Sequence, residues 1–150
     1  MKNDLEGRTL RLQRTLNAPR QLVWDAWTQP EHISAWWGPP NMATNIVAHD
    51  FTPGGKWHYS MALPDGSEFN AFGEFKEIQI PERIVTAASF PPMTTDVVLV
   101  ITFEDLGAQT RITFETIHET AAYKQQQEQM GWLNGWGAHF DSLAAYVANV

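Results

Sequence analysis

The chain of 150 residues contains no cysteine, which excludes disulfide bonds, thiolate metal sites and a cysteine nucleophile. It also lacks any apolar run near the roughly 20 residues that a helix needs to span a bilayer. Lysine and arginine total only 10, the net charge is −7, and the basic residues are scattered along the chain. Nucleic-acid binding requires a clustered basic face, and an acidic surface disfavours anionic membranes. We therefore expect neither nucleic acid nor membrane as a partner.

The N-terminus from Met1 to Gly7 lacks the apolar region of a signal peptide. A hydrophobic fraction of 43% and a charged fraction of 18% are typical of a globular protein and not of a disordered chain. The sequence shows no internal repeat, linker or low-complexity segment. We expect a single domain over residues 1–150, in a cytoplasmic protein.

Residues 17–57 contain five of the seven tryptophans, placed between prolines and glycines. Alternation of apolar and polar residues over 8–16 predicts a strand with one buried face. Pro19, at the first helical position, and Pro30 then begin two short helices, and Gly38 followed by two prolines ends the second. The tryptophans predicted to pack these helices into the core are Trp24, Trp27 and Trp36.

From about residue 42 to 118 the pattern changes to strands separated by turn signals. Gly54-Gly55 indicates a bulge or tight turn, and Asp65-Gly66 supplies the positive φ angles that tight hairpins require. Consecutive hairpins predict an antiparallel meander.

The segment from Tyr123 to Val150 is predicted to form one long helix. Its apolar stripe, at three- and four-residue steps, consists of Leu133, Trp136, Phe140, Leu143 and Val147. Gly131, Gly135 and Gly137 interrupt it and suggest a bend or a close approach in its N-terminal half.

A sheet with one apolar face must bury that face against another layer. The C-terminal helix is the one predicted element long enough to cover six or seven strands. The fold class is therefore α+β, and a helix against a strongly curved sheet leaves space near one end, where small-molecule pockets tend to form.

The chain resembles the START-like, or Bet v 1-like, superfamily (SRPBCC domains), and most of all the branch named after the activator of heat-shock-protein ATPase. No single motif is decisive, but the set occurs in the family's order over nearly the whole chain. The matching stretches are A-P-R-Q-L-V-W-D-A-W-T-Q-P-E at 18–31, W-W-G-P at 36–39, D-F-T-P-G-G-K-W at 50–57, P-D-G at 64–66, P-E-R-I-V at 81–85, T-R-I-T-F at 110–114 and G-W at 131–132.

The resemblance implies a helix-grip fold, in which a curved antiparallel sheet wraps around the long C-terminal helix and encloses a cavity. Members of the superfamily bind lipids, sterols, polyketides and plant hormones, and some are cyclases or hydrolases. The chaperone activators themselves pair this domain with a separate N-terminal domain, for which 150 residues leave no room. The resemblance also suggests a homodimer.

Candidate site residues fall into two groups. Aromatic and apolar residues expected to line the cavity are Trp57, Tyr59, Met61, Trp132 and Trp136, which suit a flat aromatic or hydrophobic ligand. Ionisable residues whose alternation places them toward the interior are Arg14, Glu74 and His118. A charge in an apolar pocket is costly unless it is paired, so each of these three either forms an ion pair or meets a ligand.

The five histidines lack metal-site spacing, and no serine has the nucleophile-elbow pattern. We expect no metal and no tightly bound organic cofactor. The leading hypothesis is a protein that binds a small hydrophobic or aromatic molecule. Two alternatives remain open: a cyclase, dehydratase or hydrolase using the same cavity, with Arg14, Glu74 or His118 as acid or base, and a chaperone-associated interaction module.

Overall fold

The computed structural model describes residues 2–37, 44–91 and 94–148. The elements are α1 (Lys2–Gly7), β1 (Thr9–Leu16), α2 (Arg20–Thr28), α3 (Pro30–Trp36), β2 (Thr44–His49), β3 (Lys56–Ala62), β4 (Glu68–Gln79), β5 (Arg83–Phe90), β6 (Thr94–Asp105), β7 (Thr110–Ile117), α4 (Ala121–Gln129) and α5 (Trp132–Ala148).

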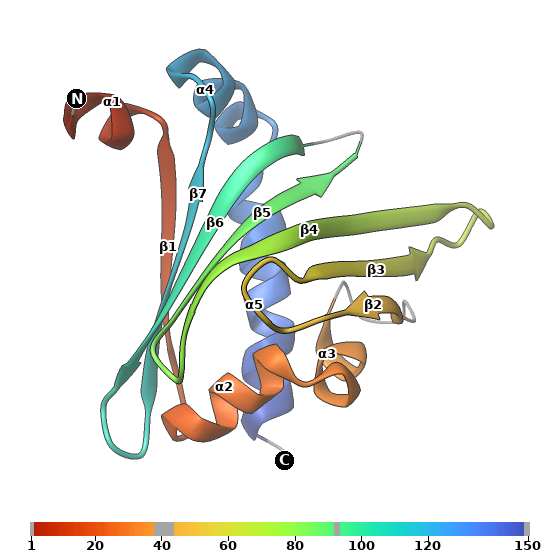
Figure 1. The fold of residues 1–150 in the computed structure, drawn as a ribbon, viewed down its shortest axis with the longest axis vertical. Coiled ribbons are helices and arrows are strands. Elements are labelled where there is room, and N and C mark those ends of the chain that lie inside the picture. The colour runs from red at the N-terminus through yellow and green to blue at the C-terminus, as the bar shows by residue number, and fades with distance from the viewer. Residues whose placement is uncertain (1, 38–43, 92–93, 149–150) are drawn as a thin grey trace.

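The sheet has seven strands in the order β1-β7-β6-β5-β4-β3-β2, and every neighbouring pair is antiparallel. Strands β2 to β7 form a meander, and β1 joins it beside β7 at the far edge. Figure 1 shows this sheet curving around α5, with α2 and α3 at one end of the helix and α4 at the other. The predicted α+β helix-grip fold is confirmed.

The inner face of the sheet is apolar because alternate residues of each strand point toward α5. On β6 the inward residues are Val97, Leu99, Ile101 and Phe103, all of which are buried. Full burial of each large apolar side chain contributes about 1.5–3 kcal/mol.

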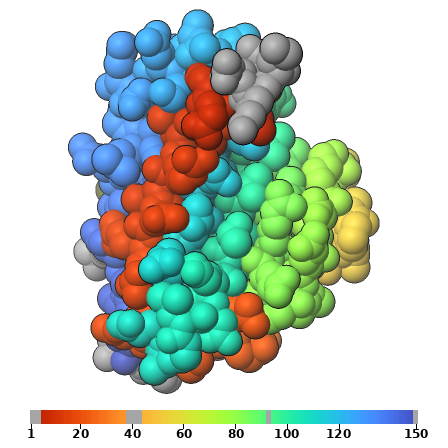
Figure 2. Space-filling view, turned by 90° about the vertical axis from the view of Figure 1, so that its left-hand side faces the viewer, coloured from red at the N-terminus to blue at the C-terminus, as the bar shows by residue number. Residues whose placement is uncertain are grey.

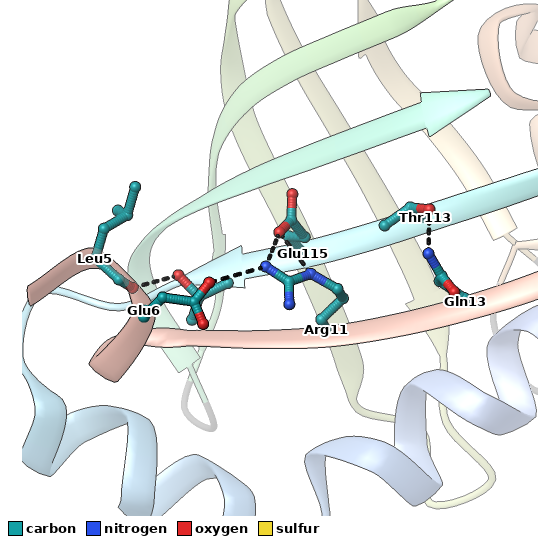
Figure 3. A network of polar contacts seen from close by, with 7 residues as sticks. Leu5, Glu6, Arg11, Gln13, Thr113 and Glu115 are labelled. Carbon is teal, nitrogen blue, oxygen red and sulfur yellow. Dashed lines mark hydrogen bonds and ion pairs between the residues drawn. The ribbon is translucent and has the colours of Figure 1, made fainter. Parts of the chain in front are cut away.

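The outer face of the sheet is polar, as the β1–β7 pair illustrates. Arg11 lies opposite Glu115 and forms an ion pair with it at 2.7 Å, and the side chain of Gln13 donates to Thr113 at 3.2 Å (Figure 3). Such exposed pairs contribute at most about 1 kcal/mol. They do, however, oppose a one-residue slip in register, which would bury these polar groups.

The two short helices are close to their predicted positions. Pro30 occupies the first turn of α3, as predicted, but Pro19 has extended backbone angles and caps α2, which begins at Arg20. Trp24, Trp27 and Trp36 are buried, which confirms the prediction that they pack in the core. The indole N–H of Trp36 donates to the carbonyl of Ala26 at 2.7 Å and so joins α3 to α2. The predicted stop at Gly38 lies outside the described residues.

The C-terminal segment is two helices, and the prediction of a single helix from Tyr123 was wrong. Gly131 adopts a φ of 97°, a left-handed conformation that ends α4 and that glycine adopts without strain. Thr120 caps the start of α4 by accepting a hydrogen bond from the backbone N–H of Tyr123. Leu133, placed in the buried stripe by its spacing, is exposed.

Two further features position the helices. The short α1 was not predicted, and it lies near α4 at the same end of the molecule (Figure 1). Figure 2 shows β1 running between β7 and α5, so this edge strand is flanked by the helix. Arg14 of β1 forms an ion pair with Asp141 of α5 at 2.6 Å and fastens the two elements together.

Candidate functional site

A cavity of about 510 Å³ lies beside the N-terminal half of α5. Side chains from α3, α4, α5 and the ends of β3 to β6 surround it. The described lining residues are Trp37, Met61, Leu63, Phe69, Phe90, Thr94, Gln127, Met130, Gly131, Trp132, Gly135, Trp136 and His139.

The lining is mainly apolar and rich in aromatic rings. Among the lining residues that the structure describes, none is Asp, Glu, Lys or Arg, and the polar side chains are Thr94, Gln127 and His139. The volume falls within the roughly 300–1,000 Å³ typical of small-molecule sites. A mostly apolar wall with a few polar groups is the usual composition of such a site.

Trp136 packs against aromatic rings from several elements around the cavity. Its ring centroid lies 4.4 Å from that of Phe114 in the sheet and 5.4 Å from that of Phe90. The Trp37 ring stands nearly perpendicular to it at 6.4 Å. The contacts with Phe90 and Trp37 are edge to face and the contact with Phe114 is tilted, and together they hold the Trp136 ring in a fixed orientation.

His139 lies among tryptophan rings and is partly buried. Its ring centroid is 4.4 Å from Trp37, 5.0 Å from Trp136 and 5.1 Å from Trp36. Burial lowers the pKa of His139 to about 3, because the apolar surroundings disfavour the charged imidazolium. Its Nε2 atom is buried and has no hydrogen-bond partner among the described residues.

One side of the cavity is closed by contacts between α4 and the start of β6. The hydroxyl of Thr94 donates to the side-chain carbonyl of Gln127, and the backbone N–H of Thr95 donates to the Tyr123 hydroxyl at 2.7 Å. Met130 lines the cavity and is also 57% exposed, so it stands at the mouth.

Three of the predicted aromatic and apolar residues line the cavity together: Met61 from β3, and Trp132 and Trp136 from α5. The indole N–H of Trp132 donates to the Thr116 hydroxyl at 3.1 Å, which fixes this ring against the sheet.

Trp57 and Tyr59 are buried but lie behind the lining, where their rings pack against Trp37 at 6.3 and 5.1 Å. Tyr59 is oriented by a hydrogen bond with His49. Because a carbonyl can only accept, Nε2 of His49 donates to the carbonyl of Thr28, and Nδ1 therefore accepts a hydrogen bond from the Tyr59 hydroxyl. Burial raises the pKa of Tyr59 well above its usual range, so its hydroxyl stays protonated.

Arg14 and Glu74 do not appear among the described lining residues. Arg14 faces α5, where it pairs with Asp141 and donates to the carbonyl of Gly137 at 3.3 Å. Glu74 lies on the outer face and pairs with Lys76 at 3.2 Å. The prediction that Glu74 faces the interior assumed that Phe72, at the same parity of the strand, points inward. It was wrong because Phe72 is exposed.

His118 is fully buried, as its alternation predicted, but it lies under α4 and α1 and not in the described lining. Its Nδ1 donates to the carbonyl of Arg8 at 3.1 Å, and its ring meets the edge of Tyr123. Burial lowers the pKa of His118. The residue therefore joins the N-terminal segment to α4.

His139 is a site residue that sequence reasoning missed although the sequence carried a signal for it. It follows Trp132 and Trp136 at seven and three residues, which places all three on one face of a helix. That spacing was a usable signal. By contrast, Leu63, Phe69, Phe90 and Gln127 reach the cavity from separate elements, and no local pattern brings them together.

No group of three or more His, Asp or Glu side chains that could hold a metal ion occurs among the residues the structure describes. Within the same residues, no helix is both long and apolar enough to cross a membrane.

Similar folds occur in solved bacterial structures. Protein Ms6760 from Mycobacterium smegmatis superposes with a TM-score of 0.84 at 26% identity, covering 97% of this chain and 94% of that one. A protein from Arthrobacter aurescens superposes with a TM-score of 0.85 at 25% identity, covering 98% of this chain and 90% of that one. Protein NE0264 from Nitrosomonas europaea superposes with a TM-score of 0.81 at 25% identity, covering 95% of this chain and 96% of that one. The comparison with curated proteins finds no match.

The sequence itself matches one family pattern over residues 17–148, from the start of α2 through α5. The match includes all the described residues that line the cavity. The chain therefore belongs to the family described as activator of Hsp90 ATPase homolog 1-like proteins.

Proposed function

We propose that this protein binds a small hydrophobic or aromatic molecule in the cavity beside α5. The observation that carries the proposal is the cavity itself, about 510 Å³ in volume, with a predominantly apolar and aromatic described lining. Removal of an apolar molecule from water into such a site is favourable by about 25 cal/mol per Å² of apolar surface buried.

The same geometry favours binding over acid–base catalysis. The acid–base candidates from the sequence, Arg14, Glu74 and His118, are all engaged elsewhere in the structure. His139 is the titratable group in the described lining, and its pKa of about 3 makes it a weak base at neutral pH.

A direct test is titration of the protein with a panel of neutral aromatic and aliphatic compounds, with binding measured by tryptophan fluorescence and by calorimetry. Because Trp37, Trp132 and Trp136 line the cavity, we expect a bound ligand to change the emission. A panel that produces neither a fluorescence change nor heat of binding would contradict the proposal.

A matched pair of variants locates the binding. Gly135 lines the cavity, and a Cβ atom there would meet no atom within 4 Å, so Gly135→Leu adds a side chain without a backbone clash. We expect it to weaken binding by about tenfold or more. Leu133→Ala, which removes exposed apolar surface from the same helix, serves as the control and should leave affinity unchanged. Equal affinities for all three proteins would place the ligand elsewhere.

The family description supports a second candidate, an association with the chaperone Hsp90. The test is the ATPase rate of purified Hsp90 with and without this protein. A rate that rises with added protein would support the second candidate, and an unchanged rate would reject it.

A further inference from the structure

Three polar side chains around the cavity have partners within the protein. The Thr94 hydroxyl donates to Gln127, the Gln127 amide lies 3.7 Å from the sulfur of Met130, and the indole N–H of Trp132 is bonded to Thr116. His139 is the described lining residue with a polar atom, Nε2, that is both buried and without a hydrogen-bond partner in the described part of the chain.

A buried polar atom without a hydrogen bond is rare in native proteins. In the described residues it occurs at Nε2 of His118 and of His139, and of these two residues His139 lines the cavity, where a ligand can supply the partner. The imidazole of His139 is neutral, so Nε2 is a donor in one tautomer and an acceptor in the other. A hydroxyl group suits either tautomer because it both donates and accepts.

The described lining offers nothing to pair with a charge. It contains no Asp, Glu, Lys or Arg, and Arg14, which approaches Gly137 from β1, is already paired with Asp141. The net charge of −7 further disfavours anions. Cations find no carboxylate in the described lining, and the rings of Trp37, Trp136 and His139 meet one another edge to face.

We propose that the cavity selects uncharged ligands, and that His139 forms a hydrogen bond with a hydroxyl or similar neutral polar group on an otherwise apolar, aromatic molecule. This inference rests on the proposed function and defines the class of ligand. Shape and aromatic contact hold the body of the molecule, and His139 fixes its polar end.

Three ligands with the same ring system test the selectivity: 2-naphthylmethanol, 2-naphthoate and 2-naphthylmethylammonium, compared by calorimetry at pH 7. We expect the alcohol to bind at least about tenfold more tightly than either ion, because an unpaired charge loses its hydration on entry. An ion that binds as tightly as the alcohol overturns the inference while the proposed function stands. If neither these three nor the neutral panel binds, the proposed function fails and the inference fails with it.

Variants of His139 test the hydrogen bond. His139→Phe should weaken binding of 2-naphthylmethanol by about tenfold and leave binding of 2-methylnaphthalene, which has no polar group, nearly unchanged. His139→Gln, which keeps a polar group, should recover part of the loss. Equal losses for both ligands, or none for either, contradict the assignment.

A measurement on the unaltered protein avoids any effect of the substitution on folding. With 15N-labelled histidine, 2-naphthylmethanol should shift the imidazole nitrogen resonances of His139 more than 2-methylnaphthalene does. Identical shifts with both ligands overturn the hydrogen bond.

Discussion

The two halves of α5 both carry large apolar side chains but have different surroundings. In the C-terminal half, Phe140, Leu143 and Val147 are buried at 0%, 0% and 3% exposure. In the N-terminal half, Trp132, Trp136 and His139 line a cavity. One half of the helix packs a core, and the other borders a space large enough for a small molecule.

The difference follows from what covers each half. Near the C-terminal half, α2 and α3 supply bulky aromatic residues, and Trp27 stacks on Phe140 at 5.5 Å. Near the N-terminal half, α4 supplies a mainly polar segment in which Gln127 is buried. A polar helix cannot fill an apolar space, so the cavity remains. The cavity in this chain therefore lies beside the half of α5 that is next to the polar helix α4.

The largest expected effect is on the packed half. Phe140→Ala should lower the free energy of unfolding by about 3–5 kcal/mol, because a fully buried ring leaves a void among close-packed neighbours. Urea denaturation monitored by circular dichroism measures this change in the free energy of unfolding. Leu133→Ala, at an exposed position of the same helix, should change stability by no more than about 0.5 kcal/mol. A similar cost for both would contradict the contrast between the two faces.

The next effect depends on pH and concerns the cavity half. His139 has a pKa of about 3 in the folded protein, against 6.5 as its ordinary value. Below pH 6.5 the unfolded chain binds a proton that the folded protein excludes, so stability falls as the pH drops toward 3. The slope from this group is at most about 1.4 kcal/mol per pH unit.

The matched variant for this pH effect is His139→Phe, whose unfolding free energy should depend less steeply on pH over the same range. Burial also lowers the pKa of His49 and His118, so some slope remains in the variant. Identical profiles for the two proteins would show that His139 is protonated in the folded state.

A smaller effect is expected at the boundary between core and cavity. Trp136→Ala should cost about 1–2 kcal/mol, less than Phe140→Ala, because one side of its ring already faces a space. It should nevertheless weaken ligand binding strongly, since it removes a wall of the cavity. Thermal unfolding and the naphthylmethanol titration measure the two quantities. A stability loss as large as that of Phe140→Ala would mean that both halves of α5 are core.

How much of the fold and of the cavity could be predicted from the sequence depends on whether the contacts are local along the chain or join separate elements. Alternation along β6 and the turn at Asp65-Gly66 are local patterns, and they predicted the sheet correctly. Helical spacing alone could not show that Leu133 faces solvent, because that depends on α4 ending at Gly131. Glu74 was misplaced because an exposed phenylalanine, Phe72, mimicked an inward residue.

The smallest expected effects come from two glycines that sequence alone treated as equivalent. Gly131 has a φ of 97°, so Gly131→Ala should destabilise the protein by about 1 kcal/mol. Gly135 lies inside α5 with open space around its Cβ position, so Gly135→Ala should stabilise the protein by about 0.5–1 kcal/mol. Denaturation midpoints of the two variants provide the measurement. Changes of the same sign would mean that the break between α4 and α5 does not depend on the left-handed residue. Opposite signs would show that α4 ends because of the left-handed backbone at Gly131.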